Sequence, residues 1–123
     1  MEIRVDRNIN ILGKPVRILA ADTGDGYSVT ISGGDRGHIG AVGIASPETG
    51  VRVITFPEHK ETVIAEKWAG EICRLSGRAA VVSAGIHFDN INKEGIETVL
   101  SVMDEELSDI LKIICAKDCP PIC

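Results

Sequence analysis

Apolar residues recur every three or four positions near the end of the chain, and this spacing predicts an α-helix. The stripe runs from Ile96 to Ile114 and places its apolar side chains on one helical face. Asn92 is a suitable N-cap, with Glu94 in the first turn, and Gly95 weakens the helix by about 1 kcal/mol relative to alanine. The pattern therefore predicts one long amphipathic helix that packs against the rest of the domain.

A second helical stripe lies in the middle of the chain, at residues 63–75. The hydrophobic period changes from two to about 3.6 residues around residues 56–59, so we expect the helix to begin there. Pro57 and His59 would then belong to its first turn, where proline is well tolerated. Gly77 is a suitable residue for its C-terminal end.

Apolar and polar residues alternate in the first part of the chain, as expected for strands with one packed face. Residues 16–21 and 27–32 face each other across the glycine-rich turn at 23–26, which predicts a hairpin. Residues 1–5 alternate more weakly and predict an edge strand that ends at the polar turn 6–8.

Three further strands are expected along the chain. Ile39–Ala45 is apolar or glycine on both faces, so we expect it to be covered on both sides or to let a ligand approach Gly40 and Gly43. Val51–Thr55 completes a meander of strands, and the nearly continuous apolar run Ala79–Ile86 predicts a central strand. The order of elements predicts an α+β fold, in which a mostly antiparallel sheet of five to six strands carries two main helices on one face.

The chain divides into one domain and a short tail. We expect residues 1–114 to form a single α+β domain and residues 115–123 to form a C-terminal tail that contains Cys115, Cys119 and Cys123. These cysteines are separated by three residues each, which differs from the two-residue spacing typical of zinc and iron–sulfur ligands. No secretion signal accompanies them, so we do not expect a disulfide framework.

Charge and composition exclude some classes of partner. The chain of 123 residues has a net charge of -5, and it contains one tryptophan, one tyrosine and two phenylalanines. A nucleic-acid-binding surface needs clustered Lys and Arg or stacked rings, so no nucleic acid is expected. No apolar run approaches the roughly 20 residues of a membrane span, and no signal-peptide pattern is present. We therefore expect a cytoplasmic protein without a membrane partner.

The glycine-rich segment 33–38 is the first candidate for a ligand site. Backbone N–H groups of its glycines and of the glycine that follows could face an anion, namely Gly33, Gly34, Gly37 and Gly40. A phosphate could also pair with Arg36, Arg52 or Lys60. The segment matches neither a P-loop nor a dinucleotide-binding motif, because its spacing differs and a strand follows it. A purely structural hairpin loop is the alternative interpretation.

The three histidines of the chain each lie where a regular element is expected to begin or end. Asp89 follows His87 by two residues, so an extended backbone would bring the carboxylate within reach of the imidazole. The positive end of a helix dipole would keep His59 neutral and able to bind a metal ion. If His38 joins them, the three form a metal or ligand site, with zinc, iron, manganese or nickel as candidates. Three unrelated polar histidines are the alternative.

Three segments resemble those of a known family, in order and spacing. They are residues 37–42 (Gly-His-Ile-Gly-Ala-Val), 59–61 (His-Lys-Glu) and 84–89 (Ala-Gly-Ile-His-Phe-Asp). The chain is similar in these segments to the prenylated-flavin chaperones associated with gallate decarboxylase, and the similarity extends over residues 27–111.

The resemblance implies a non-catalytic carrier that binds prenylated flavin mononucleotide (FMN), or FMN, made available by a flavin prenyltransferase. It also implies support for the oxidative maturation of the cofactor and its delivery to a prenylated-flavin-dependent decarboxylase. A divalent metal ion that bridges His59 and the flavin phosphate and a homodimer are implied as well. The candidate cofactor-binding residues are Gly34, Arg36, His38, Gly40, Lys60, His87 and Asp89.

Two other functions remain open for the same residues. A small metal-dependent enzyme would use His59 and His87 as ligands and Asp89 or Glu61 as general base. A structural or regulatory subunit would use the histidines only as hydrogen-bonding residues.

Overall fold

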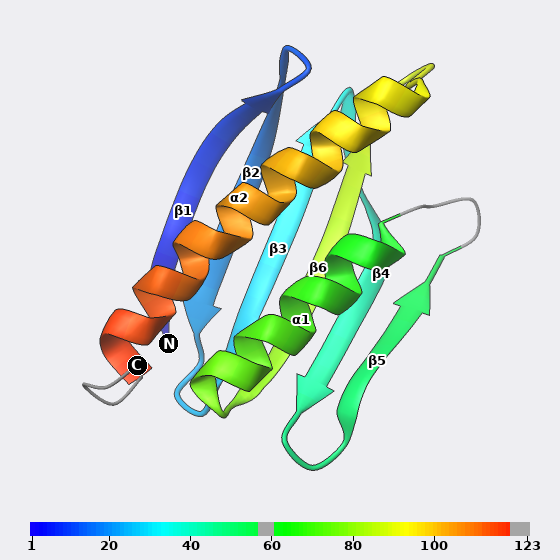
Figure 1. Cartoon of the computed structure of the whole chain (residues 1–123). Coiled ribbons are helices and arrows are strands. Elements are labelled where there is room, and N and C mark those ends of the chain that lie inside the picture. Colours follow the sequence, from blue (N-terminus) through cyan, green and yellow to red (C-terminus); the bar gives the residue numbers. More distant parts are fainter. Residues whose placement is uncertain (57–60, 119–123) are drawn as a thin grey trace.

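The protein is a six-stranded sheet with both helices on one face (Figure 1). The computed structural model describes residues 1–56 and 61–118. The elements in chain order are β1 (Glu2–Ile11), β2 (Lys14–Asp22), β3 (Gly26–Gly34), β4 (Arg36–Ser46), β5 (Gly50–Thr55), α1 (Thr62–Ser76), β6 (Ala79–His87) and α2 (Lys93–Asp118). This architecture confirms the predicted α+β fold class.

The order of the strands across the sheet is β1-β2-β3-β6-β4-β5. β6 is a central strand, as predicted, and it lies parallel to β3 and antiparallel to β4. The predicted hairpin of β2 and β3 is also present. The expectation of a simple meander up to β5 is wrong, because β6 separates β3 from β4. The chain must therefore cross the end of β6 when it passes from β3 to β4.

β1 is longer than the sequence pattern suggested. We expected a turn at residues 6–8, but the strand continues through them and pairs with β2 as far as Ile11. Arg17 donates hydrogen bonds of 2.9 and 2.8 Å to Asp6 from the neighbouring strand. The turn follows instead at Leu12 and Gly13, whose φ angles are 51° and 78°. Polar residues here mark the exposed side of a strand and not its end.

α1 packs on β4 at a glycine. A Cβ at Gly43 would lie 2.2 Å from the carbonyl oxygen of Ala65, so only glycine lets the helix come this close. The backbone of Gly43 therefore faces a helix, and a ligand does not approach it from this side. The opposite face of β4 is open, since Ile44 is 40% exposed. The expectation that this strand is covered on both faces is therefore wrong.

The C-terminal end of α1 follows an ordinary capping rule, whereas no side chain caps its N-terminal end. The described helix begins at Thr62, after Glu61, and the predicted start at Pro57 and His59 lies outside the described residues. Its C-terminal end is at Gly77 as predicted, where a φ of 71° lets the backbone N–H bond Cys73 O.

α2 is capped as predicted. The side-chain oxygen of Asn92 accepts a hydrogen bond of 2.7 Å from the N–H of Gly95. The helix continues to Asp118. The backbone of residues 115–118, which we had assigned to a separate C-terminal tail, is therefore part of α2. Residues 119–123 lie outside the described residues. No helix in the described ranges is long and apolar enough to cross a membrane.

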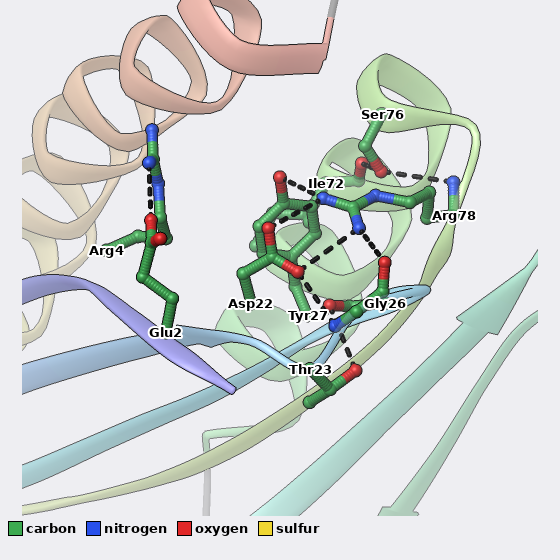
Figure 2. Close-up of polar contacts among 10 residues, drawn as sticks. Glu2, Arg4, Asp22, Thr23, Gly26, Tyr27, Ile72, Ser76 and Arg78 are labelled. Carbon is green, nitrogen blue, oxygen red and sulfur yellow. Dashed lines mark hydrogen bonds and ion pairs between the residues drawn. The ribbon is translucent and has the colours of Figure 1, made fainter.

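A buried ion pair ties the β2–β3 turn to the start of β6 (Figure 2). The guanidinium of Arg78 bonds both carboxylate oxygens of Asp22, at 3.2 and 3.3 Å, and also donates to Tyr27 Oη and to Gly24 O. Asp22 is one of two buried charged residues in the described part of the chain. The cluster lies at the end of the sheet where β6 begins, whereas His38 and His87 lie where β6 ends.

The sheet face opposite the helices is open and partly apolar (Figure 1). The strand register pairs Val81 with Ile44 and Val42 with Ile54, so these side chains share that face. Ile54 is 58% exposed and Val81 41% exposed. This face therefore presents a contiguous apolar patch to solvent.

Candidate functional site

The candidate site lies at one end of the strands, where β3 and β6 finish and β4 begins. His87 is the last residue of β6 and pairs with Gly34 of β3 and with Arg36 of β4. The N–H of Asp35, between them, donates a hydrogen bond of 2.7 Å to His87 O. A Cβ at Gly34 would lie 2.2 Å from that same oxygen. The glycine-rich segment thus folds closely around the end of β6, and this close approach explains its glycines.

His87 is held by an acidic residue, as its sequence context predicted. His87 Nε2 lies 2.8 Å from Asp89 Oδ1, and the N–H of Asp89 donates to Asp35 Oδ2, also at 2.8 Å. This backbone hydrogen bond is the main cause that lowers the pKa of Asp35, and Lys14, 3.4 Å away, adds to it. A carboxylate partner fixes the orientation of an imidazole ring.

His38 is held by a second acidic residue, Glu61, which precedes α1. His38 Nε2 lies 3.1 Å from Glu61 Oε1, and both side chains are largely buried, with 16% and 8% of their surface exposed. Glu61 Oε2 is buried and has no hydrogen-bond partner among the described residues. A buried acceptor without a hydrogen bond raises the free energy of the folded protein until a donor reaches it.

A bulge in β4 brings His38 to this position. The pairs Gly37–Ile86 and Ala41–Ala84 enclose three residues of β4 but only Gly85 of β6. A Cβ at Gly85 would lie 1.5 Å from the carbonyl oxygen of His38. The bulge therefore needs a glycine opposite it.

The two imidazoles lie next to each other. The ring centroids of His38 and His87 are 5.8 Å apart, and the rings meet edge to face at 79°. Together with their partners they form a row in the order Glu61, His38, His87 and Asp89. Two oriented imidazoles flanked by carboxylates can bind a metal ion or accept hydrogen bonds from a polar ligand.

The remaining predicted site residues have different placements. Arg36 is exposed beside His87, and Gly40 is buried, where its carbonyl accepts a hydrogen bond of 2.9 Å from Phe56 N–H. His59 and Lys60 lie outside the described residues. Within residues 1–56 and 61–118, no group of three His, Cys, Asp or Glu side chains is arranged to hold a metal ion. The role of His59 as metal ligand therefore stays a prediction.

Two cavities flank the row of acids and histidines. One, of about 610 Å³, is lined by Asp35 and Asp89 and by the start of α2. The other, of about 100 Å³, is apolar except for Glu61. Neither cavity was predictable from the sequence, because their walls come from distant segments. The sequence indicated Glu61 only weakly, because the residues next to it in the chain do not show whether its carboxylate is buried or exposed.

Comparison with known proteins gives the family. A family model described as the prenylated flavin chaperone LpdD-like domain matches residues 12–115. The chain therefore belongs to this family, which confirms the resemblance found in the sequence. Protein LpdD of Lactiplantibacillus plantarum is 29% identical over 82 residues, which are 63% of this chain and 60% of that protein. The match thus spans less than two thirds of the relative's length.

A solved structure shares the fold. It comes from a chaperone complex for yeast 20S proteasome assembly, with a TM-score of 0.59 and 14% sequence identity. The alignment covers 89% of this chain and 95% of the other. At this level of identity the likeness concerns the architecture alone.

Proposed function

We propose that this protein carries prenylated FMN, or FMN, and delivers it to a prenylated-flavin-dependent decarboxylase. The observation that carries the proposal is the family match, which includes both His38 and His87. The carrier would receive the cofactor after a flavin prenyltransferase has made it, and it would perform no chemistry itself.

A divalent metal ion would bridge His59 and the flavin phosphate. The chain is acidic, with a net charge of -5, so it offers a phosphate little long-range attraction. A metal ion would supply the missing positive charge locally, and Arg36 and Lys60 would add to it. The imidazoles of His38 and His87, with Asp89, would then contact the rest of the ligand.

The test is a titration of FMN and prenylated FMN against metal-free and metal-loaded protein. We expect binding only with metal, and we expect His59→Ala to abolish it. Asn8→Ala, at an exposed position of β1 far from the histidines, is the control and should bind like wild type. Metal-dependent binding that persists in His59→Ala would exclude His59 as the bridge.

We also propose that the carrier is a homodimer that buries the open face of the sheet. Exposed apolar side chains at Ile44, Ile54 and Val81 support this, because such a patch is unfavourable in water. Ile44→Glu should yield monomers in light scattering coupled to size exclusion. Val63→Glu, which replaces a 61% exposed residue of α1, is the matched control and should not change the mass. A monomeric wild type would refute the dimer.

A small metal-dependent enzyme is the second candidate function. The two acid–imidazole pairs, Glu61 with His38 and Asp89 with His87, favour it because such pairs serve as general bases. Turnover separates the two functions. A carrier releases one flavin per site, whereas an enzyme consumes substrate in excess of its own concentration.

A further inference from the structure

The apolar cavity of about 100 Å³ lies between the start of α1, the end of β6 and the start of α2. Its walls are aliphatic except for one aromatic ring and one acid, Glu61 at its edge. The lining residues are Glu61, Ile64, Phe88, Ile91, Ile96, Val99 and Leu100. A cavity with walls of this kind excludes water and favours an apolar group.

The cavity adjoins the row of acids and histidines at two points. Glu61 lines it, and the Oε1 atom of this residue lies 3.1 Å from His38 Nε2. Phe88 also lines it and follows His87 in the chain. A ligand held at the histidines can therefore place an apolar part in this cavity without a change in the fold.

The volume restricts what this apolar part can be. About 100 Å³ exceeds the roughly 30 Å³ that a water molecule occupies in the liquid, and it is less than the roughly 150 Å³ of an apolar cavity that holds benzene. A tricyclic flavin ring is too large for it. The cavity is open on one side, so a branched unit of five carbons, which is what a prenyl group adds to a flavin, can enter it while the ring system stays outside.

We propose that this cavity receives the prenyl-derived part of the cofactor and makes the protein select prenylated FMN over plain FMN. This inference rests on the proposed carrier function. Both ligands carry the same phosphate, so the phosphate cannot distinguish them. Burial of the added carbons can, and we expect a preference of at least roughly tenfold for the prenylated form.

Glu61 adds a polar requirement at the edge of the cavity. Its Oε2 atom is buried and has no hydrogen-bond partner among the described residues. A ligand that brings an N–H or O–H to this oxygen would satisfy it, whereas a simple hydrocarbon would not. The cavity therefore suits an apolar unit that is attached to a polar group with a hydrogen-bond donor.

The test compares the dissociation constants of prenylated FMN and FMN, measured with metal-loaded protein by fluorescence quenching. Val99→Phe fills the cavity, and Ile96→Phe fills it from a half-buried position that disturbs folding less. We expect either variant to lower the preference by roughly tenfold and to change FMN binding less than about twofold. Val102→Phe is the same substitution one turn further along α2, outside the cavity lining, and should keep the wild-type preference.

The outcomes separate this inference from the carrier function. Equal wild-type affinity for the two flavins would overturn the inference and leave the carrier function standing. An unchanged preference in a folded Val99→Phe or Ile96→Phe protein would do the same. If metal-loaded wild type binds neither flavin, the carrier function fails and the inference fails with it.

Discussion

Gly85→Ala is expected to disturb the fold and the candidate site together. The alanine Cβ would lie 1.5 Å from His38 O, whereas real Cβ atoms essentially never approach other atoms within 3.0 Å. The bulge of β4 must therefore move away from β6 by about 1.5 Å, against backbone on both sides. This displacement moves the backbone of His38 and with it the imidazole ring of the candidate site.

The size of the effect follows from the cost of overpacking. Inserted carbons in a packed interior typically cost about 1–3 kcal/mol, and rigid backbone atoms place this site at the upper end, near about 3 kcal/mol. For a domain of this size, the melting temperature should fall by about 10 °C. Thermal denaturation followed by circular dichroism measures this change.

Gly70→Ala is the matched control. Its Cβ would meet only Val51 Cγ2, the end of a side chain, at 3.1 Å, and alanine favours the helix by about 1 kcal/mol over glycine. We expect an unchanged or slightly raised melting temperature. NMR then tests the site, because the rings of His38 and His87 should lose their mutual NOE in Gly85→Ala and keep it in Gly70→Ala. A Gly85→Ala protein that melts like wild type and keeps this NOE would refute the reasoning.

Three further predictions concern stability measured by urea unfolding. Arg78→Gln leaves the Asp22 carboxylate buried without its guanidinium and should cost about 3 kcal/mol, whereas Arg74→Gln, in an exposed pair, should cost less than about 1 kcal/mol. Equal losses would contradict this. Asn92→Ala should cost about 1 kcal/mol through the lost cap. Asp35→Asn should destabilise the protein at neutral pH, because the folded pKa of Asp35 lies below its ordinary 3.8. That difference should disappear as the pH falls from about 4 through the lowered pKa, and a constant difference would refute it.

The helices and the central strand were predictable because their signals are local. The stripe from Ile96 to Ile114 and the run Ala79–Ile86 carry their own periodicity, and Gly77 and Asn92 cap the helices as expected. The continuation of β1 through residues 6–8 was not predictable in this way. Its polar side chains are stabilised by pairing with β2, and that pairing is not visible in a single strand.

The site was predictable only in part. The His87–Asp89 contact follows from two residues in one extended segment, so the sequence indicated it. The His38–Glu61 contact joins a strand to the start of a helix. It depends on a bulge in β4 that cannot be predicted from the local sequence. Similarly, the glycine-rich segment was interpreted as a possible anion cradle. Its glycines are required by the crossing over the end of β6, which depends on the strand order.

The described residues of the three segments that carry the family resemblance are neighbours in space. Residues 37–42 contain the bulge with His38, and residues 84–89 contain both Gly85, which makes room for that bulge, and His87. The third segment, 59–61, ends at Glu61, whose Oε1 lies 3.1 Å from His38 Nε2. The first and third segments therefore each contribute one side chain to the row of acids and histidines, and segment 84–89 contributes two, His87 and Asp89. A side chain added at Gly85 would displace His38 and with it the contact to Glu61, so a change at this one glycine disturbs residues of all three segments.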